Sequence, residues 1–132
     1  MEPLLSGSSV ASQLWFPRQM KMSMLEETVY NIAKMFSRFP GGRRRANGDY
    51  SGEEFREDVV LPLLRKYERV TFDLTGSAGY SSGFLDEAFG ELGALMPLDE
   101  VSRRVHLIAL DDPDAVDIAW ERIRDASKER SR

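Results

Sequence analysis

Residues 69–93, RVTFDLTGSAGYSSGFLDEAFGELG, contain the pattern that decides the fold of this chain. Apolar residues at 70, 72 and 74 alternate with polar ones, which is the period of a β-strand. After the glycines and serines, apolar residues return at 84, 88, 92 and 95, with Leu85, Phe89 and Met96 beside them. That spacing is typical of an amphipathic helix. The stretch therefore predicts a strand, a tight loop and a helix that Pro97 ends.

A second helix is predicted upstream of this strand. Ser51 followed by Glu54 forms a capping box, so the helix is expected over about 52–66. Its apolar face is expected at Phe55, Val59, Leu63 and Tyr67, one residue in every four. Pro62 lies within this run and lacks a backbone donor, so a kink or break is expected near Leu61.

Two more strands and a last helix complete the pattern. TVYNIAKMF, from Thr28, is predicted to be the first strand. RRVHLIALD is apolar at nearly every position over 105–110, which predicts a strand buried on both faces. Asp112 and Pro113 form an N-cap with proline at the first helical position, and they predict a helix over about 113–128.

Strands that alternate with helices predict an α/β fold, with a small, mostly parallel or mixed sheet and helices packed on it. At least three strands are expected, and QLWF near the N-terminus is a candidate fourth. We expect one domain over residues 28–128. Residues 1–27 form an N-terminal extension that holds the candidate edge strand, and residues 129–132 form a charged tail.

Composition limits the function classes. The 132 residues include no cysteine, which excludes disulfides, thiolate catalysis and cysteine-ligated zinc. No apolar run approaches the roughly 20 residues that cross a bilayer, and the N-terminus does not resemble a signal peptide. We therefore expect a soluble, cytoplasmic protein of one domain, without membrane contact and without a cofactor or metal.

The charge distribution argues against a dedicated nucleic-acid binder. Residues 1–66 hold 10 basic and 8 acidic side chains, whereas residues 67–132 hold 8 basic and 14 acidic ones. The net charge is −4, and no broad basic face is present to neutralise phosphates. A local basic patch is still compatible with this distribution.

VTFDLTG followed by YSSGFL resembles the STAS domain, the fold of the anti-sigma-factor antagonists. In that family an apolar strand ends in Asp, and after a short loop a motif of the Asp-Ser-Ser-Gly-Leu type opens a helix. With SGEEFRED upstream, FDLTGSAGYSSGFLDEAFGEL is similar to a group of small bacterial STAS-like proteins of unknown function. The resemblance covers residues 28–126 by element order and implies the α/β fold.

The resemblance also implies a candidate phosphoacceptor. In the antagonists the first serine of the motif accepts phosphate from a partner kinase, and the phosphate decides which partner is bound. This role corresponds to Ser81, with Ser82 beside it, whereas Tyr80 stands where the family has Asp and so removes a charge next to the acceptor. A second interpretation needs no chemistry, because one of the two serines can simply cap the helix.

A protein partner is expected to contact the loop at Tyr80–Gly83 and the face of the following helix. The partner-binding residues of this hypothesis are Tyr80, Gly83, Phe84, Asp86 and Glu87. The carboxylates of Asp86, Glu87 and Glu91 are expected to share the solvent side of that helix. This acidic rim has too few oxygen donors for a hard cation.

Arg43, Arg44 and Arg45 lie in a turn-rich loop and form a candidate anion-binding site, because guanidinium groups bind phosphate through paired hydrogen bonds. An ordinary solvated surface explains the same triplet. His106, the only histidine, is expected at a core or edge position of its strand rather than in catalysis. The spacing of Gly76, Gly79 and Gly83 matches neither a P-loop nor a dinucleotide fingerprint.

The leading hypothesis is a non-enzymatic regulatory or interaction module. The resemblance implies a partner of the ATP-binding switch-kinase type. One alternative is a sensor of a nucleotide or an anionic small ligand that uses the arginine loop. Another is a stoichiometric inhibitor of a larger complex, encoded by a phage or mobile element.

Overall fold

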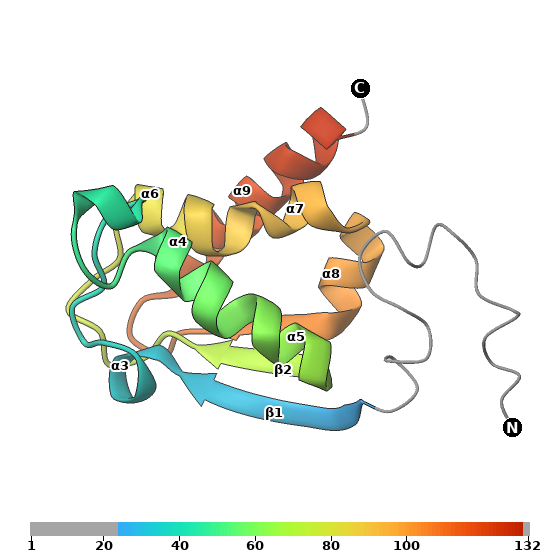
Figure 1. Ribbon diagram of the computed structural model, residues 1–132, viewed down its shortest axis with the longest axis horizontal. Helices are drawn as coiled ribbons and strands as arrows, with labels where there is room; N and C mark the ends of the chain where they lie inside the picture. Colours follow the sequence, from blue (N-terminus) through green and yellow to red (C-terminus); the bar gives the residue numbers. More distant parts are fainter. Residues whose placement is uncertain (1–23, 131–132) are drawn as a thin grey trace, which may run out of the picture.

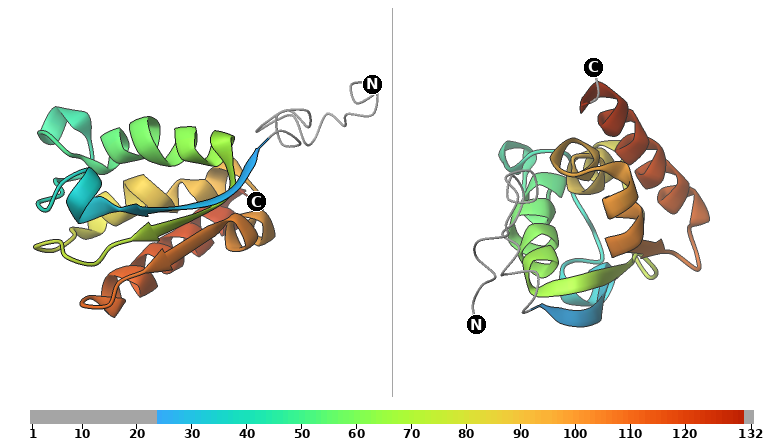
Figure 2. Two further views of the ribbon diagram at one scale, coloured as in Figure 1. Left: turned by 90° about the horizontal axis from the view of Figure 1, so that it is seen from below. Right: turned by 90° about the vertical axis from the view of Figure 1, so that its right-hand side faces the viewer.

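The computed structural model describes residues 24–130. Three parallel strands form one sheet in the order β1 (Leu25–Asn31), β2 (Tyr67–Asp73) and β3 (Val105–Ile108). The long helices lie together on one face of this sheet (Figures 1 and 2). The α/β class predicted from the sequence is therefore confirmed, and the sheet is parallel throughout its described part.

Two helical connections join the strands. Between β1 and β2, α4 (Gly52–Phe55), the π-helical η3 (Arg56–Val60) and α5 (Leu61–Lys66) form one continuous helix, 52–66. Between β2 and β3, α6 (Ser82–Leu85), the π-helical η4 (Asp86–Gly90) and α7 (Leu92–Leu95) form the central helix, 82–95, and α8 (Leu98–Arg104) follows. After β3, α9 (Pro113–Arg130) packs along the central helix.

The first strand lies earlier than the sequence predicted. β1 begins at Leu25 and ends at Asn31, and the single-turn α3 (Ile32–Met35) follows where we expected the strand to continue. The reason is a cap: the Oδ1 atom of Asn31 accepts a hydrogen bond of 2.8 Å from the backbone N–H of Lys34. Asn31 thus starts a helix. QLWF, the candidate fourth strand, lies outside the described residues.

Helix 52–66 opens as predicted but presents a different face. The Ser51 Oγ atom accepts from the Glu54 N–H at 3.0 Å, whereas the Glu54 carboxylate accepts from the N–H of Tyr50 rather than that of Ser51. The π-helical turn adds a residue, so the fully buried side chains are Phe55, Val60 and Leu64 rather than those one residue in every four. The helix passes Pro62 without ending.

The central helix lies between helix 52–66 and α9, and three glycines allow the close approach. A Cβ at Gly52 would lie 2.5 Å from the carbonyl oxygen of Phe84, and one at Gly90 would lie 3.0 Å from the Arg122 Cβ. At Gly93 it would overlap the carbonyl oxygen of Ile123. Gly90 and Gly93 thus lie against the chain's own last helix.

One helix was not predicted. Pro97 ends the central helix as expected, but it is also the N-cap of α8, so Arg103 and Arg104 are helical and β3 begins only at Val105. Arg104 is 1% exposed, and its guanidinium donates to the backbone carbonyl oxygens of Leu64, Tyr67 and Glu68. It thereby satisfies carbonyl groups at the junction between α5 and β2.

The core is built around Phe55. Its ring centroid lies between 4.9 and 5.9 Å from those of five other aromatic side chains, Tyr30, Phe36, Phe72, Phe84 and Phe89. Each such pair contributes about 0.5–1.5 kcal/mol beyond the burial of its surface. Phe55 thus joins β1, β2 and the two long helices.

The face of the sheet away from the helices is exposed in the described part of the chain. β3 is an edge strand of this part of the sheet. The prediction that β3 is buried on both faces is wrong, because Val105 and Leu107 are buried whereas His106 is exposed. Leu25 and Val29 of β1 are also exposed. The helices cover only one face, because each crossover returns on the same side (Figure 2).

The last helix is longer than expected. α9 extends to Arg130, so Glu129 and Arg130 belong to it rather than to a charged tail. Among residues 24–130, no helix combines the length and the apolar character that a bilayer crossing requires.

We predict that Gly93→Ala destabilises the fold although alanine is the better helix former. The added methyl group overlaps backbone of α9, and overpacking of this kind costs about 1–3 kcal/mol. Urea unfolding gives the free energy of unfolding. The control is Glu91→Ala at an exposed position of the same helix, where a change within about 0.5 kcal/mol is expected. Equal or greater stability of Gly93→Ala would contradict this packing.

Candidate functional site

Ser81 and Ser82 begin the central helix at the carboxyl end of the sheet. Ser81 is the N-cap: its Oγ accepts from the Phe84 N–H at 3.0 Å and donates to the carbonyl oxygen of Gly41 at 3.3 Å. Ser82 is exposed, and its hydroxyl has no hydrogen-bond partner among residues 24–130. The capping interpretation thus applies to Ser81, while Ser82 presents a free hydroxyl.

Tyr80 fastens the loop to the end of β2. Its hydroxyl donates to the carbonyl oxygen of Leu74 at 2.9 Å, and its ring lies 5.7 Å from that of Phe84. Burial, together with the negative charges of Asp111 and other nearby aspartates, raises the pKa of Tyr80 from 10.0 to about 12. The residue that replaces the family's Asp therefore has a structural role in this loop.

The loops that follow the three strands are joined to one another. The Leu110 N–H donates to Thr75 Oγ1, and the Gly76 N–H donates to Asp111 Oδ2. The Ala78 N–H donates to the carbonyl oxygen of Arg38 at 2.9 Å. Hydrogen bonds of this kind fix the loops as one surface.

Asp73, at the end of β2, stays ionised in this surface. Burial disfavours its charged form, but hydrogen bonds from Thr75 and Asn31 and the nearby charge of Lys34 outweigh burial and hold the pKa of Asp73 below its ordinary value. The Thr75 N–H donates to Asp73 Oδ1 at 3.0 Å. Asp73 is thus a structural carboxylate of the strand end.

The arginine triplet is paired with the chain's own carboxylates. Arg43 Nη1 lies 2.5 Å from Asp86 Oδ2, and Arg45 Nη2 lies 3.2 Å from Glu57 Oε1 and 3.0 Å from Asp58 Oδ1. Hydrogen bonds to these carboxylates, against a small effect of burial, raise the pKa values of Arg43 and Arg45. Most of the triplet's charge is neutralised within the molecule.

Glu87 is buried, contrary to the acidic rim that we expected. Its side chain is 6% exposed and accepts from Arg56 Nη1 at 2.9 Å. Arg56 Nη1 also donates to the backbone carbonyl oxygen of Glu87 at 2.7 Å. Arg43 and Arg44 lie 3.4 and 3.8 Å from the same carboxylate. A buried carboxylate needs such partners. Glu87 therefore has a structural role, in which it holds the arginines of two other segments against the central helix.

Two of the five residues predicted to contact a partner are therefore inside the molecule. Phe84 is fully buried against Phe55, and Glu87 is buried. Asp86 is paired with Arg43, and a Cβ at Gly83 would lie 3.4 Å from the Arg43 Cβ. Tyr80, Gly83 and Asp86 are partly exposed, and Glu91 of the rim is exposed.

Three exposed apolar side chains at the carboxyl end of the sheet were not predicted from the sequence. Met35 and Phe39, after β1, are 61% and 68% exposed, and Leu110, after β3, is 86% exposed. KMF was interpreted as a strand, which hid Met35, and IAL was interpreted as buried, which hid Leu110. No signal in a single sequence separates an exposed apolar loop residue from a core residue.

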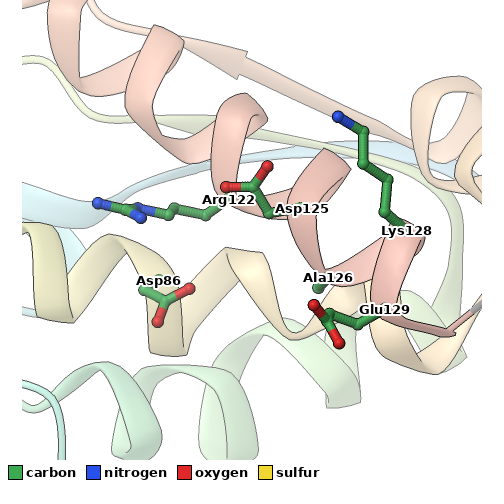
Figure 3. A pocket seen from close by; sticks show the side chains of 6 residues that line it. All are labelled: Asp86, Arg122, Asp125, Ala126, Lys128 and Glu129. Carbon is green, nitrogen blue, oxygen red and sulfur yellow. The ribbon is translucent and has the colours of Figure 1, made fainter.

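A depression of about 380 Å³ lies between η4 and α9, lined by Asp86, Arg122, Asp125, Ala126, Lys128 and Glu129 (Figure 3). Figure 3 shows the guanidinium of Arg122 and the ammonium of Lys128 pointing in different directions. Charges of both signs that do not converge select no class of ligand. Among residues 24–130, no group of three His, Asp or Glu side chains is arranged to hold a metal ion.

We predict that Tyr80→Phe lowers the free energy of unfolding by about 1 kcal/mol at neutral pH, because the Leu74 carbonyl loses its donor. Burial raises the pKa of Tyr80, so its contribution is complete below pH 10 and is lost as the pH rises towards 12. The difference between wild type and variant should shrink over that range in urea unfolding. Unchanged stability at pH 7 would show that this hydrogen bond contributes nothing.

Residues 51–115 match the family described as a STAS-like domain of unknown function. The match begins at the Ser51 cap, includes β2, the serine motif and β3, and ends in α9. Searches of curated proteins and of solved structures gave no match. Residues 51–115 therefore belong to the family of STAS-like domains of unknown function.

Proposed function

We propose that the protein is a non-enzymatic regulatory module that binds a partner protein through its carboxyl-end surface. We define this surface as Met35, Phe39, Ser81, Ser82 and Leu110. The observation that carries the proposal is the exposure of three large apolar side chains, Met35 at the end of α3 and Phe39 and Leu110 on loops, at the same end of the sheet as an exposed serine pair. Exposed apolar groups rimmed by polar residues are typical of protein interaction sites.

The surface is suited to recognition because its loops are held in place. The Ser81 Oγ donates to the Gly41 carbonyl oxygen, and the Ala78 N–H donates to that of Arg38. A surface that is already ordered loses little conformational entropy when a partner binds. This arrangement supports docking onto the loops rather than onto the central helix.

The serine pair supports a switch within this surface. Phosphate on the exposed Ser82, or on Ser81 as the STAS resemblance implies, adds nearly two negative charges to the surface that also presents Phe39 and Leu110. That charge would oppose an apolar partner and favour a basic one. We propose a partner of the ATP-binding switch-kinase type, which supplies the phosphate and is released by it.

The test compares two double variants in lysates of the native host. Phe39→Ser with Leu110→Ser removes apolar groups from the proposed surface, and Leu25→Ser with Val29→Ser removes two other exposed apolar groups from the open sheet face. We expect the wild type and the Leu25/Val29 variant to retain the same partner proteins. The amount of each retained protein should be at least tenfold lower with the Phe39/Leu110 variant. The measurement is quantitative mass spectrometry of the retained proteins.

The same lysates, supplied with ATP, test the switch by intact mass. Phosphate should appear on the wild type and be absent when Ser81 and Ser82 are both alanine. Equal retention by both double variants would disprove the docking surface. A wild type without phosphate would disprove the switch and leave the docking result to be judged separately.

A further inference from the structure

A cavity of about 390 Å³ lies at the carboxyl ends of β1 and β2. Asn31, Ala33, Lys34, Arg38, Thr75 and Gly76 line it. Its size falls in the range of small-molecule sites, and ligands of open α/β sheets bind outside the carboxyl ends of the strands.

The walls of the cavity are fixed by hydrogen bonds between its two sides. Asn31 Nδ2 donates to the Thr75 carbonyl oxygen at 3.2 Å, while Asn31 Oδ1 accepts from the Lys34 N–H. On the far side, the Arg38 carbonyl oxygen accepts from the Ala78 N–H. The cavity therefore exists without a ligand.

The charged groups of this cavity have the same sign. Within residues 24–130, neither Lys34 nor Arg38 forms an ion pair, although Arg38 lies over the ring of Phe39 at 5.6 Å. The nearby carboxylates of Asp73 and Asp111 accept from the backbone N–H groups of Thr75 and Gly76, and the charge of Lys34 also acts on Asp73 without a direct ion pair. Two cations at one cavity favour an anion, in contrast to the paired arginine triplet.

The floor between the cations is small and apolar. Ala33 contributes a methyl group, and Gly76 has a φ of +97°, a conformation that favours glycine. A Cβ at Gly76 would lie 3.4 Å from that of Ala33, so the absent side chain keeps the floor open. The carbon stems of Lys34 and Arg38 supply further apolar surface.

We propose that this cavity binds a small organic anion, a molecule with an apolar body and a phosphate or carboxylate group that Lys34 and Arg38 hold. None of the cavity residues belongs to the carboxyl-end surface, although the Arg38 guanidinium lies over the ring of Phe39. A ligand here would contact Arg38 and thus the loop that leads to Phe39. Ligand binding in this cavity would therefore place the domain under the control of a small molecule.

The experiment is a titration of ¹⁵N-labelled full chain, followed by NMR, with phenyl phosphate, benzoate, inorganic phosphate and benzyl alcohol. We expect phenyl phosphate or benzoate to shift the amide signals of Ala33, Lys34, Thr75 and Gly76. Inorganic phosphate and benzyl alcohol should bind at least tenfold more weakly, since each lacks one half of the recognised chemistry. Comparison of the affinities for phenyl phosphate and benzoate identifies the preferred head group.

Two variants and a matched control make the result decisive. Lys34→Ala with Arg38→Ala should weaken binding at least tenfold, and Ala33→Leu, which fills the floor and keeps both charges, should do the same. Arg65→Ala removes an exposed cation at the opposite end of the sheet and should leave binding unchanged. The amide spectrum of each variant reports whether it is folded.

Three results would overturn the proposal. The first is the absence of shifts at these amides up to about 20 mM ligand. A site with a millimolar dissociation constant would be largely occupied at that concentration. The second is equal binding by wild type and Ala33→Leu. The third is a shift of the Arg43–Arg45 signals in place of those at the cavity, which would return the anion site to the arginine loop.

Discussion

The close packing of the central helix between its two neighbours is the constraint on which the rest of the structure depends. Gly52 of helix 52–66 lies against the Phe84 backbone, and Gly93 lies against the backbone of α9. Backbone contacts of this kind leave no room for a partner along either flank. These two flanks of the helix that carries the serine motif are therefore enclosed, whereas its first residues and the loops beside them remain exposed for recognition.

Electrostatics within the fold reinforce this arrangement. The buried carboxylate of Glu87 requires Arg56 and draws Arg43 of the arginine loop to the same helix. A buried charge left without partners is strongly destabilising, so these arginines belong to the architecture. Lys34 and Arg38, which form no ion pair within residues 24–130, lie elsewhere, at the cavity beside the end of β1 where a small anion is proposed to bind.

Local chemistry made much of the fold predictable from sequence. The alternation at 70, 72 and 74 identified β2, and the capping residues Ser51 and Asp112 located two helices. The π-helical turns were not predictable, because they shift the buried face from Val59 to Val60 by long-range packing. The candidate site was harder to predict: the serines were found by their motif, whereas the burial of Glu87 depends on contacts between distant segments.

The absence of cysteine permits the most direct test of the claim that function resides at the carboxyl end of the sheet. Single cysteines at Ser82, at Phe39 and at Leu95, an exposed position near the far end of the central helix, can each carry a photo-crosslinker. After irradiation in host extract, covalent adducts are measured by mass spectrometry. We predict that one common partner is crosslinked from positions 82 and 39, and that position 95 gives no adduct with this partner. A partner crosslinked from 95 alone would contradict it.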